Sequence, residues 1–567
     1  MSTPPRSEPS FSELFTPKLV TVWREGYGLA EFRKDAIAGL TVAIVALPLS
    51  MAIAIACGLP PDRGLYTAII GGFMISAFGG SRFQIGGPAG AFIVLVATIA
   101  EKQGLDGLVL ATLMAGAMMM AVGFFRLGTY IKYIPFPVTV GFTTGIAVII
   151  FTSQIRELLG LSMAKEPAAF LPKLSALASA LPSWNPVAVG IAALSIGIIL
   201  ILRKLRPAWP GFLIAVVVGS AVTALFGLDV ATVGTRFGGV PNGLPSPALP
   251  AFSLEKARAV LPDAMAIALL GAIESLLSAV VADGMTGRRH RSNCELVAQG
   301  AANIGAALFG GMPATGTIAR TATNVRAGAH GPVSGMLHAV YLLAFMLVAA
   351  PLASHIPLAT LGGILAIVSW NMAERHEFVA LLRASRGDAL VLLATFLLTV
   401  FEDLTLAIAV GVTLGAFLFL HRMAESIEIE GGGTMVTEDV ADTAGAARTP
   451  YDGANRTGAD DIVVYRISGA FFFGATASVI ATLDRMGQLP RAFVFDFSGV
   501  PMVDITAARG IQGFAGKLAK AGTQLVVAGA RSHVRTSLVK AGLRPPEILY
   551  TVDVEQARAQ LGHPTTS

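Results

Sequence analysis

Two short segments of the sequence share one arrangement of glycine, proline and other small residues. They span residues 84–92 (QIGGPAGAF) and 310–320 (GGMPATGTIAR). In each, a Gly-Gly pair and a proline precede small residues and an apolar helical stretch. Where extended chain turns into a helix, the first backbone N–H groups lack partners within the helix, and the helix dipole adds positive potential. Two such helix starts that face each other would form a site for an anion.

The match between the two segments is more informative than either segment alone. Small residues can serve only to let helices pack closely, and for a single segment that explanation would suffice. The prolines Pro88 and Pro313, however, lie 225 residues apart, with seven apolar segments separating the two breaks. A repeat with an odd number of crossings is inserted upside down, so the pair predicts an inverted-repeat membrane protein with its binding site at the two breaks.

Arg320 and Glu274 are the charged residues whose surroundings point to chemistry. Arg320 follows the second break, where it could attract or bind an anion; the alternative is an arginine that reaches the cytoplasm from a helix end. Glu274 has no charged residue among the ten before it and the eight after it. An apolar setting favours the neutral form of a carboxyl group, so Glu274 could bind and release a proton, although pairing with Arg320 would oppose this. The alternative is a structural glutamate that caps a broken helix.

Other residue types that often carry chemistry do not form a recognisable site. His338 lies inside an apolar segment and is expected to pack or hydrogen-bond, with a proton relay as the alternative. The two cysteines, Cys57 and Cys294, lack metal-ligand or redox spacing. Because no phosphate-binding loop, metal-ligand set or Ser/His/Asp set stands out, we expect no enzyme activity, no metal and no cofactor.

The composition of the chain excludes a series of ordinary soluble domains. Of 567 residues, 54% are hydrophobic and 14% are charged, whereas a soluble domain carries about 25% charged residues. The charge is uneven, with a net +7 in residues 1–422 and a net −2 in residues 423–567. The overall net charge of +5 does not indicate nucleic acid binding, because the basic residues form no patch interleaved with aromatic residues.

Fourteen apolar segments can be marked between residues 36 and 422, and a membrane-spanning helix needs about 20 apolar residues. Eight are expected to be full spans: 36–57, 104–125, 187–203, 210–226, 262–282, 331–351, 387–401 and 404–420. Six are shorter: 65–78, 88–100, 136–151, 295–309, 314–325 and 358–371. Several of these short pieces would be tolerated at membrane depth only when buried in protein.

The basic residues of the short loops predict the orientation of the chain. If each segment crosses once, these residues, including the run 288–291, gather on one side, so both termini are expected in the cytoplasm. Contact of that run with anionic lipid is a further possibility. Residues 1–35 form a polar N-terminal segment without the features of a cleaved signal peptide.

Beyond residue 422 the sequence changes character. Residues 423–460 are rich in Gly, Asp and Thr and are expected to be a linker. From 461 to 563, strand-like runs at 462–467, 492–497 and 524–528 alternate with helical stretches near 475–486 and 506–521. This alternation predicts a small cytoplasmic α/β domain behind the transmembrane domain of residues 36–422.

Over nearly its whole length the sequence resembles the SulP family of anion transporters, also called solute carrier family 26. Residues 35–42 and 47–52 are similar to the family's first-span signature, and residues 58–66 to its continuation. Three further stretches are similar to the bacterial C4-dicarboxylic acid permease of this family: 271–287, 319–324 and 369–372. The resemblance implies an all-α polytopic membrane protein of fourteen segments in two inverted halves of seven. It also implies two half-helices, and a core domain that moves against a gate domain in an elevator-like manner.

Carried over position by position, the resemblance implies which residues contact the substrate. They are Ser50, Ile53, Ala89, Gly90, Ala91, Thr317, Ile318, Ala319 and Arg320. Some relatives have Ser at the position of Ala319, so here the backbone N–H groups would have to suffice. Glu274 matches the acidic position of the eighth segment, which implies coupling to a proton, with sodium as the alternative.

The C-terminal region resembles a STAS domain (sulfate transporter and anti-sigma factor antagonist). Its signature would be residues 496–500 followed by 504–506. In signalling members a phosphorylated Ser follows the Asp that matches Asp504, but here that position holds Ile505. The resemblance therefore implies a role in folding, assembly or regulation rather than a kinase switch.

These observations together predict a secondary active anion transporter of a bacterial inner membrane. The resemblance to the permease favours proton-coupled uptake of C4-dicarboxylates such as succinate, fumarate and aspartate. The alternatives are a sulfate or bicarbonate transporter coupled to protons or sodium, an anion exchanger, or a membrane sensor that signals through its tail. The expected partners are the small anion, the coupling ion, the lipid bilayer and a second copy of the chain in a homodimer, but no nucleic acid.

Overall fold

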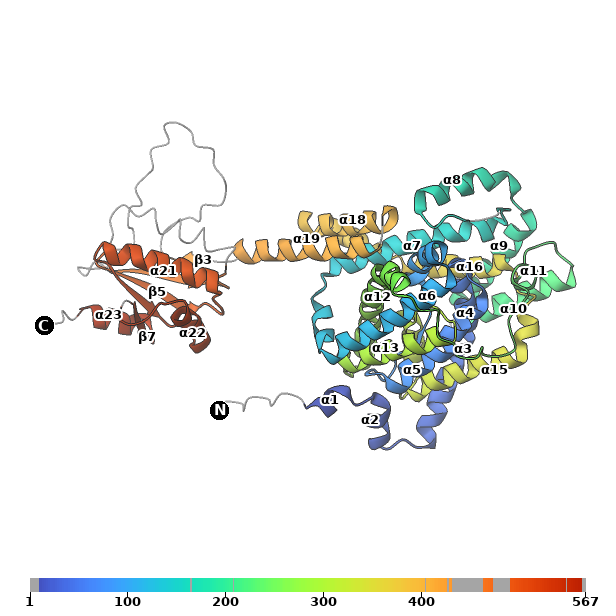
Figure 1. The fold of residues 1–567 in the computed structure, drawn as a ribbon, viewed down its shortest axis with the longest axis horizontal. Coiled ribbons are helices and arrows are strands. Elements are labelled where there is room, and N and C mark those ends of the chain that lie inside the picture. The colour runs from blue at the N-terminus through green and yellow to red at the C-terminus, as the bar shows by residue number, and fades with distance from the viewer. Residues whose placement is uncertain are drawn as a thin grey trace. The chain divides into compact units, whose positions relative to one another are not determined.

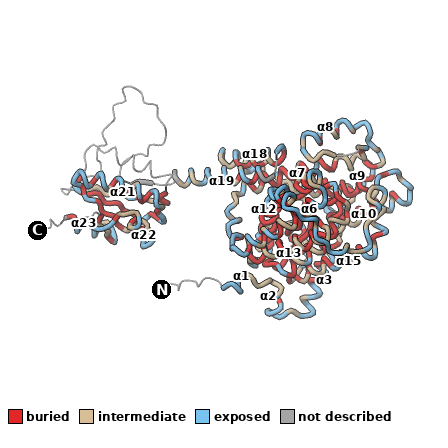
Figure 2. The backbone as a smooth tube through the Cα atoms, in the orientation of Figure 1, coloured by how far each residue is buried: buried red, intermediate tan, exposed pale blue. Residues whose placement is uncertain are grey.

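The chain divides into two compact units, Met1–Val412 and Thr413–Ser567. The computed structural model describes the following residues: 10–163, 166–206, 209–402, 404–425, 428–430, 462–472, 490–546 and 548–562. Helices build the first unit, and the second contains a five-stranded sheet (Figure 1). Buried residues run through the interior of the helical unit and along the strands of the sheet (Figure 2).

The helical unit consists of two groups of helices, each packed mainly within itself. The first group comprises α3 (Leu29–Ala56), α4 (Pro61–Tyr66), the π-helical turn η1 (Thr67–Gly71), α5 (Gly72–Phe78), η2 (Gly90–Phe92), α6 (Ile93–Phe124), α12 (Leu254–Thr286), α13 (Ser292–Leu308), α14 (Ile318–Arg326) and α15 (Val333–Ala353). The second comprises α7 (Phe136–Leu159), α9 (Pro186–Leu205), α10 (Gly211–Leu225), α16 (Leu358–Met372), α18 (Arg386–Phe401) and the part of α19 (Leu404–Glu425) that precedes residue 413. This division agrees with the expected core and gate domains.

Shorter elements surround these two groups. They are α1 (Phe11–Phe15), α2 (Lys18–Arg24), η3 (Leu127–Tyr133), α8 (Phe170–Ala180), η4 (Leu181–Ser183), α11 (Val233–Phe237) and α17 (Arg375–Ala384). The carboxylate of Asp35 ties the N-terminal segment to the loop before α15. It accepts hydrogen bonds from the Tyr27 hydroxyl at 2.8 Å and from the backbone N–H groups of His330 and Gly331 at 2.6 and 3.0 Å.

Glycines allow the closest contacts between the long helices. Helices α6 and α13 cross at Gly116 and Gly300, where a Cβ atom on either residue would lie 2.5–2.6 Å from the other's carbonyl oxygen. Small residues at such crossings let backbones approach, which is how helices associate in lipid, where burial of apolar side chains gives little driving force. The abundance of glycine, 62 of 567 residues, therefore serves packing as well as the two breaks.

The apolar segments predicted from the sequence fall mainly on helices, but several bounds and lengths differ from the prediction. Within the described residues, seven helices are long and apolar enough to cross a membrane by length and composition: Leu29–Ala56, Gly90–Phe124, Phe136–Leu159, Pro186–Leu205, Leu254–Thr286, Val333–Ala353 and Leu406–Met423. Segment 136–151 was expected to be short, yet α7 has 24 residues, because polar residues such as Gln154 continue it to a left-handed cap at Gly160. Helices α10 and α18, expected as full spans, have 15 and 16 residues.

Segments 88–100 and 104–125 join into one continuous element, η2 with α6. The junction is a kink at Gly104, whose φ of 70° lies in the left-handed region that glycine tolerates. The boundary predicted at residue 422 falls inside α19.

The second unit is a mixed sheet with strand order β3-β4-β5-β6-β7. Strand β3 (Glu428–Glu430) is antiparallel to β4 (Ile462–Ser468), and the others are parallel: β5 (Ala492–Gly499), β6 (Gln524–Ala528) and β7 (Ile548–Thr551). One face packs on α21 (Ile505–Lys520) and α22 (Ser532–Lys540) through a cluster that includes Phe493, Phe495 and Phe514. The other face packs on α23 (Val554–Gly562).

The structure confirms the α/β prediction for this unit. The three expected strands and the helix near 506–521 are present, whereas the helix expected near 475–486 lies outside the described residues. The carboxylate of Asp496 joins β5 to β4, because its two oxygens accept hydrogen bonds from Arg466 Nε at 2.9 Å and from the Ser498 N–H at 3.0 Å. Burial opposes ionisation of this carboxyl, but these hydrogen bonds outweigh it and hold the pKa of Asp496 below its usual value.

Asp496→Asn should destabilise the C-terminal unit at pH 7. The difference in stability between the variant and the unchanged protein should become smaller as the pH falls. A carboxyl group whose pKa is lower in the folded than in the unfolded protein stabilises the fold at pH values above its unfolded pKa, which is about 3.9 for Asp. This stabilisation is lost as the pH falls through the pKa of the folded protein. Limited proteolysis of the C-terminal unit against temperature, at pH 7 and pH 4, measures this. Glu555→Gln, an exposed change on α23, is the control. Equal stability of Asp496→Asn and the unchanged protein at pH 7 would contradict the prediction.

Candidate anion-binding site

The two Gly-Gly-Pro segments meet inside the helical unit as a short antiparallel pair of strands. Strand β1 (Gly86–Gly87) pairs with β2 (Thr315–Gly316), with Gly86 opposite Gly316 and Gly87 opposite Thr315. The Thr317 N–H donates a further hydrogen bond to the Ile85 carbonyl oxygen at 3.0 Å. Each strand then leads into a helix start, η2 with α6 on one side and α14 on the other. The structure thus brings together the two segments that the sequence singled out.

Both helix starts leave their first backbone N–H groups available. The residues before them, Ala89 and Thr317, have extended conformations, and neither side chain caps its helix. Solvent reaches this point, because Ala319 is exposed and Gly90, Thr317 and Ile318 are half-buried, whereas Ala89 and Ala91 are buried. Uncapped N–H groups at an accessible pair of helix starts can bind an anion without any side-chain hydroxyl.

Arg320 is the buried cation of this region, with 1% of its surface exposed. Its Nη2 lies 3.2 Å from the Ser50 hydroxyl and 3.3 Å from the Pro88 carbonyl oxygen, whereas Nε and Nη1 are buried without a hydrogen-bond partner in the described residues. Gly87, with a φ of 154°, makes room for the guanidinium, since a Cβ there would collide with Nη1. The guanidinium therefore points inward at the break rather than toward the cytoplasm.

Ser50 and Ile53, the predicted contributors from the first segment, lie on α3 and are buried. Ser50 contacts Arg320, as described above. Ile53 follows Ser50 by three residues on α3, and no hydrogen bond or ion pair involves its side chain, so any contribution to a site would be to its shape.

Glu274 lies in the middle of α12 with 8% of its surface exposed. Among the described residues it forms no ion pair with Arg320. The charged group that acts on it is instead another carboxyl, that of Glu374. Glu374 follows α16 and precedes α17, and the end of α16 reaches the first break, where a Cβ on Gly90 would lie 3.9 Å from Met372 Sδ. The pairing with Arg320 that would have opposed proton binding by Glu274 is therefore not present among the described residues.

One face of α12 holds both breaks in place through hydrogen bonds. Thr315 Oγ1 donates to the Gly271 carbonyl oxygen at 3.0 Å, and Gln84 Nε2 lies 3.0 Å from Ser275 Oγ. Ser278 Oγ donates to Thr321 Oγ1 at 3.0 Å, which in turn accepts from the Ile85 N–H at 3.1 Å. The sequence analysis did not identify Ser275 and Ser278. Their spacing of four and seven residues after Gly271 is the signal that could have found them, because such positions share a helix face.

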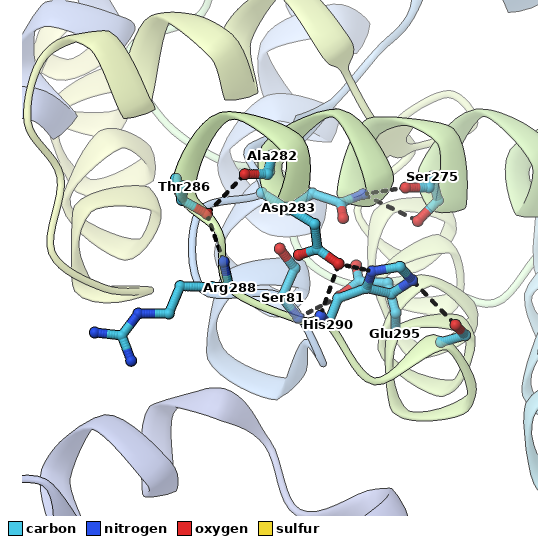
Figure 3. Close-up of polar contacts among 10 residues, drawn as sticks. Ser81, Ser275, Ala282, Asp283, Thr286, Arg288, His290 and Glu295 are labelled. Carbon is cyan, nitrogen blue, oxygen red and sulfur yellow. Dashed lines mark hydrogen bonds and ion pairs between the residues drawn. The ribbon is translucent and has the colours of Figure 1, made fainter.

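The cytoplasmic end predicted for α12 carries a second polar cluster, shown in Figure 3. The carboxylate of Asp283 lies 2.7 Å from His290 Nδ1 and accepts from the His290 N–H at 3.0 Å, and His290 Nε2 lies 3.0 Å from Ser292 Oγ. This Asp–His–Ser chain also escaped the sequence analysis. Because it links the end of α12 to the first residue of α13, it holds the turn between the two helices.

The comparisons with known proteins agree with this geometry. Residues 32–395 match the sulfate permease family and residues 454–555 match the STAS domain. The chain is 40% identical to "Putative sulfate transporter YvdB" of Bacillus subtilis, over 92% of this chain and 95% of that protein. It is 33% identical to "Bicarbonate transporter BicA" of Synechocystis, over 89% and 90%.

Solved structures show the same fold. The structure of SLC26A9 superposes with a TM-score of 0.82 at 18% identity, covering 96% of this chain and 92% of that one. The transmembrane domain of the cyanobacterial bicarbonate transporter BicA superposes with a TM-score of 0.60 at 32% identity, covering 68% of this chain and 98% of that one.

Arg320→Ala should weaken anion binding by roughly tenfold to a hundredfold, because a hydrogen bond to a charged group contributes about 1.5–3 kcal/mol. Isothermal titration of the purified protein with small oxyanions measures the affinity. Arg326→Ala, at the exposed end of the same helix, is the matched control and should bind as the unchanged protein does. An unchanged affinity in Arg320→Ala would reduce Arg320 to a structural residue.

Proposed function

The chain belongs to the sulfate permease family of anion transporters, and from this premise we propose that it carries a small inorganic oxyanion, with sulfate as the first candidate, across a bacterial inner membrane. The observation that supports this proposal most strongly is that the buried guanidinium of Arg320 lies beside the two uncapped helix starts. Its Nε and Nη1 have no hydrogen-bond partner among the described residues. An oxyanion at this point would accept from both sets of donors. The proposed binding set is the predicted one: Ser50, Ile53, Ala89, Gly90, Ala91, Thr317, Ile318, Ala319 and Arg320.

This proposal shifts the substrate from the dicarboxylate expected from the sequence to an inorganic anion. The relatives compared above are named for sulfate and bicarbonate and none for a dicarboxylate. The two carboxylates of a dicarboxylate are separate groups that would each need donors, whereas the oxygens of one sulfate ion can share the single cluster of donors described above. Bicarbonate is the second candidate, supported by the 33% identity to a bicarbonate transporter over 89% of the chain.

Coupling to a cation through Glu274 is part of the same proposal. The Glu274 carboxyl is nearly buried, and the charged group that acts on it electrostatically is the carboxyl of Glu374. Two carboxylates that interact electrostatically disfavour simultaneous ionisation, so we propose that they take up a proton, or a sodium ion as the alternative. Outside the membrane-spanning helices, burial raises the pKa of Glu374, and Glu377 adds to this. Glu374 therefore supports the proton as coupling ion.

The arrangement of the helices supports an elevator-like cycle. Both breaks, Arg320 and Glu274 belong to the first helix group, whereas Glu374 follows α16 of the second. Movement of the first group against the second would carry the anion and would change the distance between the two carboxyls. We assign the STAS domain, residues 461–563, which follows the linker 423–460, to assembly or regulation. We also propose that the protein is a homodimer with both termini in the cytoplasm.

Uptake of labelled anions into proteoliposomes tests the substrate. We expect sulfate to enter faster than succinate, and an imposed pH gradient, acidic outside, to accelerate entry. An imposed sodium gradient without a pH gradient should have no effect. Preferential succinate uptake would refute the inorganic substrate, acceleration by sodium alone would refute the proton, and binding without flux would favour a sensor.

Glu274→Gln should abolish the acceleration by a pH gradient while leaving anion binding intact, since the amide cannot exchange a proton. Glu255→Gln, near the exposed start of the same helix α12, is the matched control and should keep the full response. Paired measurements of flux and of binding by titration separate coupling from folding. A pH response retained by Glu274→Gln would exclude Glu274 as the coupling residue.

A further inference from the structure

A second cavity, of different chemistry, lies between the two helix groups. It has a volume of about 510 Å³ and is bounded by α3 and α15 of the first group and by α10 of the second. Its floor includes Met51 and Leu65, each 1% exposed. We call it the α10–α15 cleft. It shares no residue with the candidate anion site.

Small residues on both walls leave the cleft unfilled. Helix α10 contributes Ala221 and Ala224, and α15 contributes Ala349, Ala350 and Ala353. Elsewhere in this unit small residues let helices touch, as at Gly116 and Gly300, but here they line open space. The cleft is therefore not a crossing point of two helices, and its volume is available to another molecule.

The lining excludes an anion and a water cluster as occupants. None of the lining residues is charged, and Ser220 and His355 are the polar ones. An ordered water needs two to four polar partners, which carbon-lined walls do not offer. A mostly apolar cavity with one or two placed polar groups is the ordinary composition of a site for an apolar molecule.

The cleft continues into apolar surface that would face the bilayer. Val217 on its rim is 57% exposed and Leu352 is 71% exposed. Helix α15 qualifies as a membrane span and α10 as a shorter apolar helix, so the opening faces hydrocarbon when the chain is inserted. The molecule present at that depth and in that orientation is a lipid chain.

Two polar groups indicate how a lipid bound in the cleft would be oriented. Ser220 Oγ is buried without a hydrogen-bond partner in the described residues, and could donate to an ester carbonyl. His355 follows the end of α15, where the polar interface would begin, and is exposed. By the loop charges this end lies opposite the arginine-rich connections.

We propose that the α10–α15 cleft binds one acyl chain of a phospholipid, from the leaflet opposite the arginine-rich loops, with its ester group near Ser220. The site goes beyond anion binding and does not depend on it. If the two helix groups move against each other during transport, the bound chain lies between the moving parts.

Photocrosslinking of the full-length protein in nanodiscs tests the proposal. The probe is phosphatidylcholine with a diazirine in the middle of one acyl chain, and peptide mass spectrometry maps the adducts. We expect adducts concentrated on the peptides of α10 and α15 that line the cleft. Ala221→Trp, which fills the cleft, should reduce them at least fivefold. Ala193→Trp, an exposed position on α9 outside the cleft, should leave them unchanged.

Two further variants guard against a folding defect. Ala224→Leu fills less of the cleft and should cause an intermediate decrease in adducts. Ser220→Ala should move the adducts to neighbouring residues of the protein without changing the temperature of thermal unfolding. Adducts spread evenly over the lipid-facing helices, or unaffected by Ala221→Trp, would overturn the proposal. So would crosslinks between two copies of the chain at this cleft. None of these readouts measures transport, so their failure would leave the proposed function untouched.

Discussion

The pairing of β1 with β2 is the contact on which the rest of the site depends. Extended backbone deep in a membrane must have its polar groups satisfied, and here two short interruptions satisfy each other. The same hydrogen bonds fix where η2 and α14 begin and therefore where their free N–H groups point. Glycine is required at this junction because Gly87 makes room for Arg320 and a Cβ on Gly316 would collide with Gln84.

The charges of the site follow from this geometry. Arg320 is buried without a carboxylate partner in the described structure, and its two hydrogen bonds use one of its three nitrogens. An isolated buried charge is costly, and a bound anion would offset that cost by neutralising the guanidinium. Glu274, held on the helix that anchors both breaks, shares its surroundings with Glu374 instead. Within the described residues, the two ionisable groups that stand out in the apolar sequence therefore do not form an ion pair with each other.

Much of the fold could be predicted from the sequence, because hydropathy and glycine–proline patterns are local signals. The two breaks, Arg320 and Glu274 were found this way, and three strands of the C-terminal sheet were found from their apolar runs. What escaped depends on contacts between distant residues. The hydrogen bonds from α12 to Gln84 and Thr321 join positions more than 40 residues apart. The approach of Met372, at the end of α16, to Gly90 at the first break likewise joins distant positions. The extension of α7 to Leu159 was not predicted, because its last residues include polar ones, which in the sequence resemble a loop even though one face of the helix is buried.

The register of β1 and β2 places a local two-fold axis between the two strands, but the side chains around the pair do not follow this symmetry. An axis through the pair relates Gly86 to Thr315 and Gly87 to Gly316, an offset of 229 residues in both cases. Counted from the two helix starts, Gly90 and Ile318, the third helical position holds Phe92 on one side and Arg320 on the other. The backbone donors are thus duplicated, whereas the positive charge occurs once. An anion bound there would be surrounded by backbone N–H donors on both sides but by a positive side chain on one side only. It would therefore be attracted off the axis toward α14.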